Sequence, residues 1–136
     1  MRVHGKCHCG AIAVTAEVDP KHAFLCHCTD CQLMSGSAYR TLIRARADSF
    51  KLLSGKPKFY VKKGDSGAKR AQAFCPDCGT SLYSTPVEDN PKFYTLRAAI
   101  LDERDKLPPL KQIWTRSAQV WSSDLKNIES FAMQFE

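Results

Sequence analysis

The chain has 136 residues, and its 20 lysines and arginines against 14 aspartates and glutamates give a formal net charge of +6. With 43% hydrophobic and 25% charged residues, the composition is that of a folded globular protein and excludes disordered and collagen-like chains. The length predicts one domain over residues 1–136, and no apolar run approaches the roughly 18 residues that a membrane span needs.

The pattern of apolar residues predicts mostly short β-strands. Residues 11–18 alternate in polarity as a strand does, and Asp19-Pro20 after them is a turn signal. Residues 29–34 are expected to form one helical turn that stops at Ser35-Gly36-Ser37. Further strands are predicted at residues 23–25, 39–45, 50–53, 58–62, 72–74, 81–84, 92–100 and 111–115, with a polar loop at 63–69 and a short helix at 121–127. The predicted fold class is therefore mainly β.

Seven cysteines stand in three tight clusters, Cys7-His-Cys9, Cys26-His-Cys28-Thr-Asp-Cys31 and Cys75-Pro-Asp-Cys78. The odd count, together with the absence of a secretory signal core, argues against a disulfide framework, so we expect a reduced, cytoplasmic protein. A redox Cys-x-x-Cys pair would precede a long helix, and no helical pattern follows the third cluster. Thiolates two or three residues apart can close on one Zn²⁺. The clusters therefore predict zinc binding.

The number of cysteines predicts two zinc ions per chain, one in a closed site and one in an open site. Structural zinc has four protein ligands, whereas catalytic zinc has three and an exchangeable position. Spacing alone also permits a zinc ribbon made of the second and third clusters. Gly10 and Gly79 follow the first and third clusters, where a zinc knuckle turns and glycine reaches positive φ at least steric cost. We therefore expect a structural zinc on Cys7, Cys9, Cys75 and Cys78, and a catalytic zinc on Cys26, Cys28 and Cys31.

Histidine offers an alternative for the second site. If His27 were a fourth ligand, both zinc ions would be structural and the protein would have no zinc chemistry. In an extended Cys-His-Cys segment, however, neighbouring side chains point to opposite faces. We therefore expect His27 to face away from the metal, at the surface or beside the ligands, and His8 to do the same in the first cluster.

The same clusters resemble the glutathione-dependent formaldehyde-activating enzyme and centromere-protein-V-like family. The resemblance is carried by residues 5–10 (Gly-Lys-Cys-His-Cys-Gly), by the second cluster with Ser35-Gly36 after it, and by residues 74–80 (Phe-Cys-Pro-Asp-Cys-Gly-Thr), and it covers most of residues 5–122. It implies a small layered β fold of the β-tent type, stapled by zinc, with the catalytic zinc on the middle cluster. Where many members carry a histidine before an Ile-aromatic pair, this chain has Gln112-Ile-Trp114.

The resemblance also implies a carbon–sulfur lyase of the S-(hydroxymethyl)glutathione synthase type, with glutathione as the small thiol partner and formaldehyde as the aldehyde. The chemistry of an open three-thiolate zinc agrees with this activity. Three thiolates give the site a charge of −1, which opposes ionisation of a bound water, whereas a coordinated thiol becomes a thiolate and stays nucleophilic.

Substrate-binding residues are expected near the second cluster. Ser35 and Gly36 follow Cys31 closely, and their hydroxyl or backbone N–H groups could stabilise an oxyanion. Arg40, Arg44 and Arg46 share one face of a predicted strand. That face is either a solvent-exposed edge or a place where arginines, Arg40 first among them, meet the carboxylates of a peptide thiol.

The alternative function is a zinc-binding module without catalysis that binds a nucleic acid or a protein. Lys62, Lys63, Lys69 and Arg70 form only a modest basic cluster, with Asp65 inside it. Two Zn²⁺ ions on seven thiolates change the charge by +4 − 7 = −3, so the loaded protein would carry about +3. This modest charge favours a small anionic thiol over a nucleic acid.

Overall fold

The computed structural model describes residues 1–135. Its strands are β1 (Arg2–Lys6), β2 (Ala13–Cys26), β3 (Arg40–Arg46), β4 (Lys51–Ser54), β5 (Lys58–Lys63), β6 (Lys69–Phe74), β7 (Ser81–Pro86), β8 (Phe93–Arg97) and β9 (Lys111–Ile113). One α-helix, α1, covers Thr29–Ser35, and short 3₁₀ turns cover Ala47–Ser49, Ala98–Ile100, Arg104–Lys106, Thr115–Ser117 and Val120–Ser123. The prediction of a mainly β fold is confirmed. Among residues 1–135, no helix has the length and apolar character that crossing a membrane would require.

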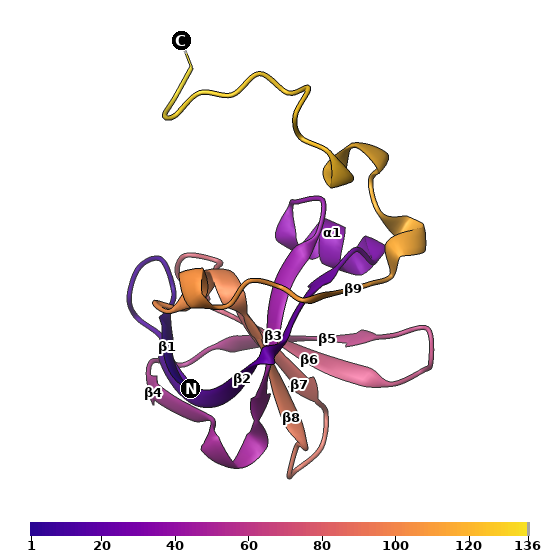
Figure 1. Cartoon of the computed structure of the whole chain (residues 1–136). Coiled ribbons are helices and arrows are strands. Elements are labelled where there is room, and N and C mark those ends of the chain that lie inside the picture. The colour runs from indigo at the N-terminus through magenta and orange to yellow at the C-terminus, as the bar shows by residue number, and fades with distance from the viewer. Residues whose placement is uncertain (136) are drawn as a thin grey trace.

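The long strand β2 joins two groups of strands (Figure 1). Its first half pairs with β1 and β4, and its second half pairs with β3 and β9. From β3 the sheet continues through β8, β7 and β6 to β5, with every pair antiparallel except β2 with β9. This layered arrangement brings the loops that carry the cysteine clusters onto one framework.

The expectation that a strand ends at Asp19-Pro20 is wrong. The chain remains in β2 there, and its pairing with β3 shifts register between Val18 and Ala23. A proline is tolerated at such an irregularity because its missing N–H removes no ladder hydrogen bond. The local turn signal therefore marks a bend within one strand that serves two groups of strands.

The main apolar core and the second cysteine cluster lie on opposite faces of β3. The core includes the fully buried side chains of Val3, Ile12, Val14, Ile43, Leu82, Leu96 and Leu101. Because side chains alternate along a strand, Ile43 faces this core whereas Leu42 packs against Cys26 and Cys31. The outer face of β3 is thus a wall of the second cysteine site.

Two further elements differ from the sequence prediction. Strand β1, with buried Val3, was not predicted, because it is short and contains a glycine. The helix expected at 121–127 is absent from the described chain, which has a 3₁₀ turn and then runs away from the sheet (Figure 1). Its polar side chains bond the backbone locally, since Ser122 Oγ donates to Gln119 O at 2.7 Å and Asp124 Oδ1 accepts from Lys126 N at 3.0 Å.

We expect Gly55→Ala to lower the free energy of unfolding by about 3 kcal/mol, because backbone strain and a steric clash add together. Gly55 has a φ of 78°, and a Cβ there would meet the backbone oxygen of Ala11 and lie 2.6 Å from Ile12 Cγ1. The measurement is urea unfolding of the metal-loaded protein. Gly67→Ala is the matched control, because Gly67 has a φ of 84° with no atom near its would-be Cβ, and it should cost only about 1 kcal/mol. Equal losses would contradict the steric clash.

Candidate metal centres

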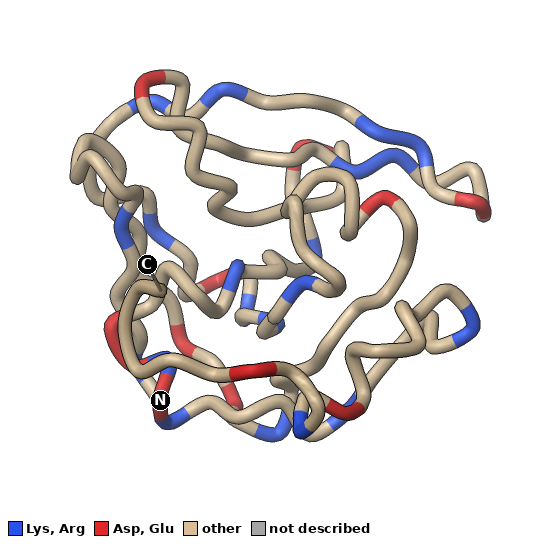
Figure 2. The backbone as a smooth tube through the Cα atoms, turned by 90° about the horizontal axis from the view of Figure 1, so that it is seen from above, with Lys and Arg blue, Asp and Glu red and all other residues tan. Residues whose placement is uncertain are grey.

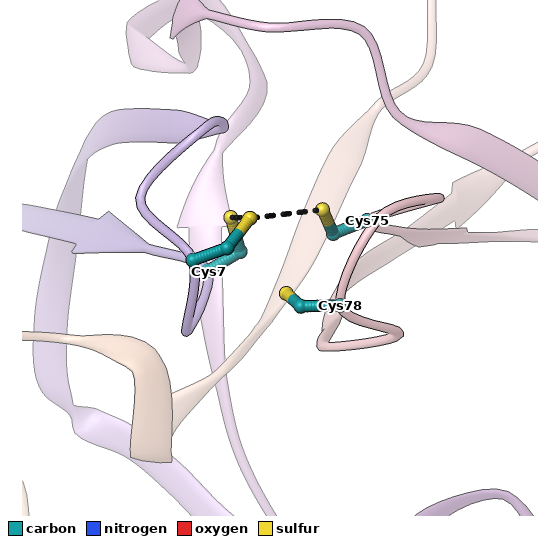
Figure 3. Close-up of side chains that lie close together, drawn as sticks. Cys7, Cys75 and Cys78 are labelled. Carbon is teal, nitrogen blue, oxygen red and sulfur yellow. Dashed lines mark hydrogen bonds between the residues drawn. The ribbon is translucent and has the colours of Figure 1, made fainter.

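Four cysteines from two loops face one another (Figure 3). Cys7 and Cys9 lie between β1 and β2, and Cys75 and Cys78 lie between β6 and β7. Their sulfur atoms lie within 4.8 Å of one another, with 3.6 Å between those of Cys7 and Cys9. This is the combination expected from the sequence, and no other Cys, His, Asp or Glu of residues 1–135 joins it. Four converging thiols suit a closed, tetrahedral zinc site.

In both loops, the glycine after the second cysteine donates its N–H back to the carbonyl oxygen of the first cysteine. Gly10 N donates to Cys7 O at 3.0 Å, and Gly79 N donates to Cys75 O at 2.8 Å. Both glycines have the positive φ that a knuckle requires, 80° and 77°. The first and third clusters are therefore two halves of one site, each closed by a glycine turn.

Thr80 connects these halves. Its hydroxyl oxygen accepts from His8 N at 3.1 Å and lies 3.1 Å from the sulfur of Cys78. This hydrogen bond and nearby backbone N–H groups lower the pKa of Cys78 to about 5, which favours the thiolate that a metal binds. The exposed His8 side chain stays outside the four-sulfur group, as the alternation of side chains predicts.

The second centre is formed by Cys26, Cys28 and Cys31, whose sulfur atoms also lie within 4.8 Å of one another. Cys26 ends β2, Cys28 caps the N-terminus of α1, and Cys31 lies in the first turn of this helix. The cap is made by Cys28 Sγ, which accepts from Cys31 N at 3.2 Å. Within residues 1–135, no fourth protein ligand completes the group. Three ligands with a free fourth position are the arrangement of catalytic zinc.

The three thiols shift one another's pKa values in different directions. The pKa of Cys31 is raised, first by the hydrogen bond that it gives to Cys26 and then by burial. The pKa of Cys26 is lowered, because its sulfur accepts that bond. Burial raises the pKa of Cys28. Since a metal takes thiolates, its binding must release protons here, and the affinity of this centre for metal falls as the pH decreases.

His27 points away from the three sulfurs and is buried rather than at the surface. Its Nε2 donates to Gln112 Oε1 at 2.8 Å, and its ring lies edge-on to that of Tyr39, with 5.3 Å between centroids. Gln112 is the position at which the chain departs from the expected histidine. The pair links the Cys-His-Cys segment at the end of β2 to the parallel strand β9 and thereby fixes the backbone between two of the cysteines.

The three-cysteine centre borders a cavity of about 210 Å³. Cys26 and Cys31 line this cavity, and Cys28 lines an adjoining one of about 500 Å³. Asp30 lies between the two cavities, where Lys62 Nζ donates to its Oδ2 at 2.7 Å. This ion pair makes Asp30 a poor fourth ligand for a metal. The thiols therefore face space that a small molecule can enter.

The arginines predicted to share one face of a strand lie in different environments. Because β3 lies between β2 and β8, it is not an edge strand, and Arg40 is only 7% exposed. Arg44 places its guanidinium 4.1 Å from the centre of the Phe93 ring and also lines the cavity. Arg46 is exposed and pairs with Asp48 at 2.6 Å. The solvent-exposed edge was thus the wrong interpretation for Arg40.

Arg97 was not identified from the sequence. It ends β8, is 5% exposed, and lines the same cavity as Arg40. A single charged residue in the middle of an otherwise mostly apolar segment, Tyr-Thr-Leu-Arg-Ala-Ala-Ile, was the available signal. This signal is weak because only the pairing of β8 with β3 brings Arg97 close to Arg40.

Ser35 and Gly36 lie at the C-terminal end of α1, whereas the cysteines hold its N-terminal end. Gly36 ends the helix with a φ of 63° and donates its N–H to Gln32 O. Ser35 lines a separate cavity of about 450 Å³, which Arg40 and Arg97 also border. A role for Ser35 and Gly36 in substrate binding remains a prediction.

The hairpin of β5 and β6 carries the basic cluster, seen as blue segments along its strands in Figure 2. Lys62 and Arg70 from this hairpin line the cavity beside the three thiols. Part of the positive charge is therefore turned toward the second cysteine centre.

Fold and sites together define a class of protein, an antiparallel β protein with two thiol clusters compatible with zinc binding, one of which borders a cavity. The profile of the family described as glutathione-dependent formaldehyde-activating enzyme matches residues 2–117. The chain belongs to this family. The family is described by a glutathione-dependent, formaldehyde-activating function.

A solved structure supports the same fold. The crystal structure of a Rhodobacter sphaeroides protein, a structural genomics target, has a TM-score of 0.60 and 23% sequence identity. The alignment covers 80% of this chain and 98% of that one. No sequence among the curated proteins matches the chain. At this identity, the likeness concerns the fold alone.

Proposed function

We propose that the protein is a zinc-dependent carbon–sulfur lyase that acts on the adduct of a small thiol and an aldehyde, with S-(hydroxymethyl)glutathione as the type substrate. The observation that carries the proposal is the centre of Cys26, Cys28 and Cys31, which has three converging thiols, no fourth ligand within residues 1–135 and a cavity beside it. Zinc held there would lower the pKa of a coordinated substrate thiol and keep it as a thiolate. The four-cysteine centre would hold a second, structural zinc.

The reaction needs few groups from the protein. In the synthetic direction, the substrate sulfur forms a bond to the aldehyde carbon, and the carbonyl oxygen receives the proton that the thiol gave up. In the reverse direction the carbon–sulfur bond breaks and the aldehyde leaves. The chain holds the three ligand sulfurs rigidly through the helix cap at Cys28 and the hydrogen bond between His27 and Gln112. The main contribution of the chain would therefore be to orient the thiol and the aldehyde inside a small cavity.

The placement of the basic cluster favours a small anionic substrate over a polyanion. Lys62 and Arg70 line the cavity, and Lys62 pairs with Asp30. Proteins that bind nucleic acid need such charges on an open surface with stacking platforms. These contacts support the lyase over a nucleic-acid-binding module.

The proposal predicts that zinc-loaded protein accelerates exchange between formaldehyde and its glutathione adduct. Exchange spectroscopy by NMR, with isotope-labelled formaldehyde, measures the rate against the spontaneous reaction. We expect an acceleration of at least about a hundredfold at micromolar protein, since orientation and thiolate formation together are worth that much. An exchange rate equal to the spontaneous one would reject this substrate pair.

A further inference from the structure

Two arginines are buried beside the three-cysteine centre. Arg40 is 7% exposed and Arg97 is 5% exposed, and both line the cavity that Cys26 and Cys31 border. A buried cation is costly unless a counter-charge or a full set of hydrogen bonds compensates it. The hydrogen bonds of each guanidinium therefore show whether a partner is missing.

Arg97 is held in place entirely by neutral groups. It donates to Gln72 Oε1 at 2.6 Å, to Ser81 Oγ at 3.1 Å, and, at 3.4 Å, to Ser84 Oγ and to the backbone oxygen of Thr95. Burial first, and the charge of Arg40 second, lower the pKa of Arg97 to about 9, so its positive charge persists at neutral pH. The guanidinium plane is fixed without any carboxylate.

Arg40 has buried donors that no group satisfies. Its Nε and Nη2 atoms have no hydrogen-bond partner among residues 1–135. Buried polar atoms almost always have partners, so an unpaired guanidinium at this depth indicates a missing acceptor. The missing acceptor is not one of the thiols, because no hydrogen bond joins Arg40 to a cysteine in the described chain.

The cavity contains little negative charge to balance these cations. Five cationic side chains line it, those of Arg40, Arg44, Lys62, Arg70 and Arg97, against one acidic residue, Asp30. Asp30 is already paired with Lys62. A zinc with three thiolates would add a charge of only −1, by the count of +2 and −3. The cavity thus stays positive even when the metal is bound.

We propose that Arg40 and Arg97 form a receptor for a carboxylate on the thiol substrate, so that the site selects small anionic thiols over neutral ones. The proposal rests on the lyase function and names its substrate class. An arginine fork donates two parallel hydrogen bonds to a carboxylate, which matches the unsatisfied Nε and Nη2 of Arg40. Because both arginines share one small cavity with Cys26 and Cys31, the carboxylate and the sulfur of the substrate must lie a few bonds apart.

The test measures binding of two thiols to the zinc-loaded protein by calorimetry. The probes are 3-mercaptopropionate, which has a carboxylate, and 2-mercaptoethanol, which has a neutral hydroxyl. We expect Arg40→Gln to weaken binding of 3-mercaptopropionate by about ten- to a hundredfold, the value of a charge-assisted hydrogen bond, and to change that of 2-mercaptoethanol by less than about twofold. Because each probe is compared across variants, differences between the two thiols themselves cancel.

Arg46→Gln is the matched control. It removes the same charge from the same face of β3, but Arg46 is exposed and paired with Asp48, so neither thiol should lose affinity. Within residues 1–135 the Nε and Nη2 atoms of Arg40 bond no other group, so Arg40→Gln takes no hydrogen bond of theirs away from a partner, and circular dichroism will check its fold. Should the glutamine variant fold poorly, Arg40→Lys keeps the charge, loses the fork and should still weaken 3-mercaptopropionate selectively.

The outcomes separate this proposal from the lyase function. Selective loss of 3-mercaptopropionate supports the receptor. Equal weakening of both thiols would mean that the arginines only balance the charge of the cysteine centre, and unchanged binding of both would remove Arg40 from the site. Either result overturns the receptor and leaves the lyase proposal standing. If neither thiol binds the wild-type protein, the receptor proposal is wrong, and the glutathione–formaldehyde exchange decides the lyase proposal separately.

Discussion

Replacing Cys75 with serine is expected to cost at least about 5 kcal/mol of stability and to leave the protein largely unfolded at 37 °C. Cys75 is fully buried, and with Cys78 it ties the loop after β6 to Cys7 and Cys9. A structural zinc supplies roughly 10–16 kcal/mol of folding energy, whereas a small domain has a total stability of about 5–15 kcal/mol. Loss of one ligand therefore removes a large share of the whole stability.

Thermal unfolding and zinc analysis on the purified variant test this expectation. Wild-type protein should contain two zinc ions per chain, and Cys75→Ser should have a strongly lowered Tm and a reduced zinc content. The comparison variant is Cys28→Ser, which changes the same atom in the other centre. A Cys75→Ser protein as stable as Cys28→Ser would show that the four-cysteine centre does not hold the fold together.

Cys28→Ser is expected to reduce the glutathione–formaldehyde exchange to its spontaneous rate while the fold survives. The variant loses one of the three ligands of the open centre, so zinc should fall from two ions to one. The helix cap persists, because a serine hydroxyl can accept the hydrogen bond from Cys31 N that Cys28 Sγ accepts. Cys28 is also only partly buried, so changes at the cap itself should cost no more than about 1 kcal/mol, and the loss of stability should stay well below that of Cys75→Ser.

NMR exchange and circular dichroism on the same sample provide the readouts. If Cys28→Ser retained the full acceleration, the three-cysteine centre would not be the active site. If it retained two zinc ions, a further ligand would have to exist, and the centre would be closed. A folded, one-zinc and inactive variant is the result that links the open centre to the activity.

The make-up of each cysteine cluster could be predicted from the sequence because it depends on local chemistry. Thiols two or three residues apart can point to one place, and the glycines after Cys9 and Cys78 favoured joining the first and third clusters. The helical turn after Cys28 was equally local, since its cap and its stop at Gly36 lie within a few residues. The mainly β fold followed from short alternating segments.

Other features depended on contacts between distant parts of the chain. Asp19-Pro20 carries a turn signal, but pairing of β2 with strands on both sides of it keeps the segment extended. The alternating positions of Arg40, Arg44 and Arg46 predicted that they share one face of a strand. They could not predict how deeply each side chain is buried.

By itself, then, the sequence determined the members of each cysteine cluster and the mainly β character of this member of the family, because spacing and periodicity act over a few residues. Only the tertiary structure decided that Arg40 lies buried beside Arg97 and the three-cysteine centre. The pairing of β3 with β8 joins residues 57 positions apart (97 − 40) in one cavity wall. Burial depends on what packs against a face, and no local pattern contains that information.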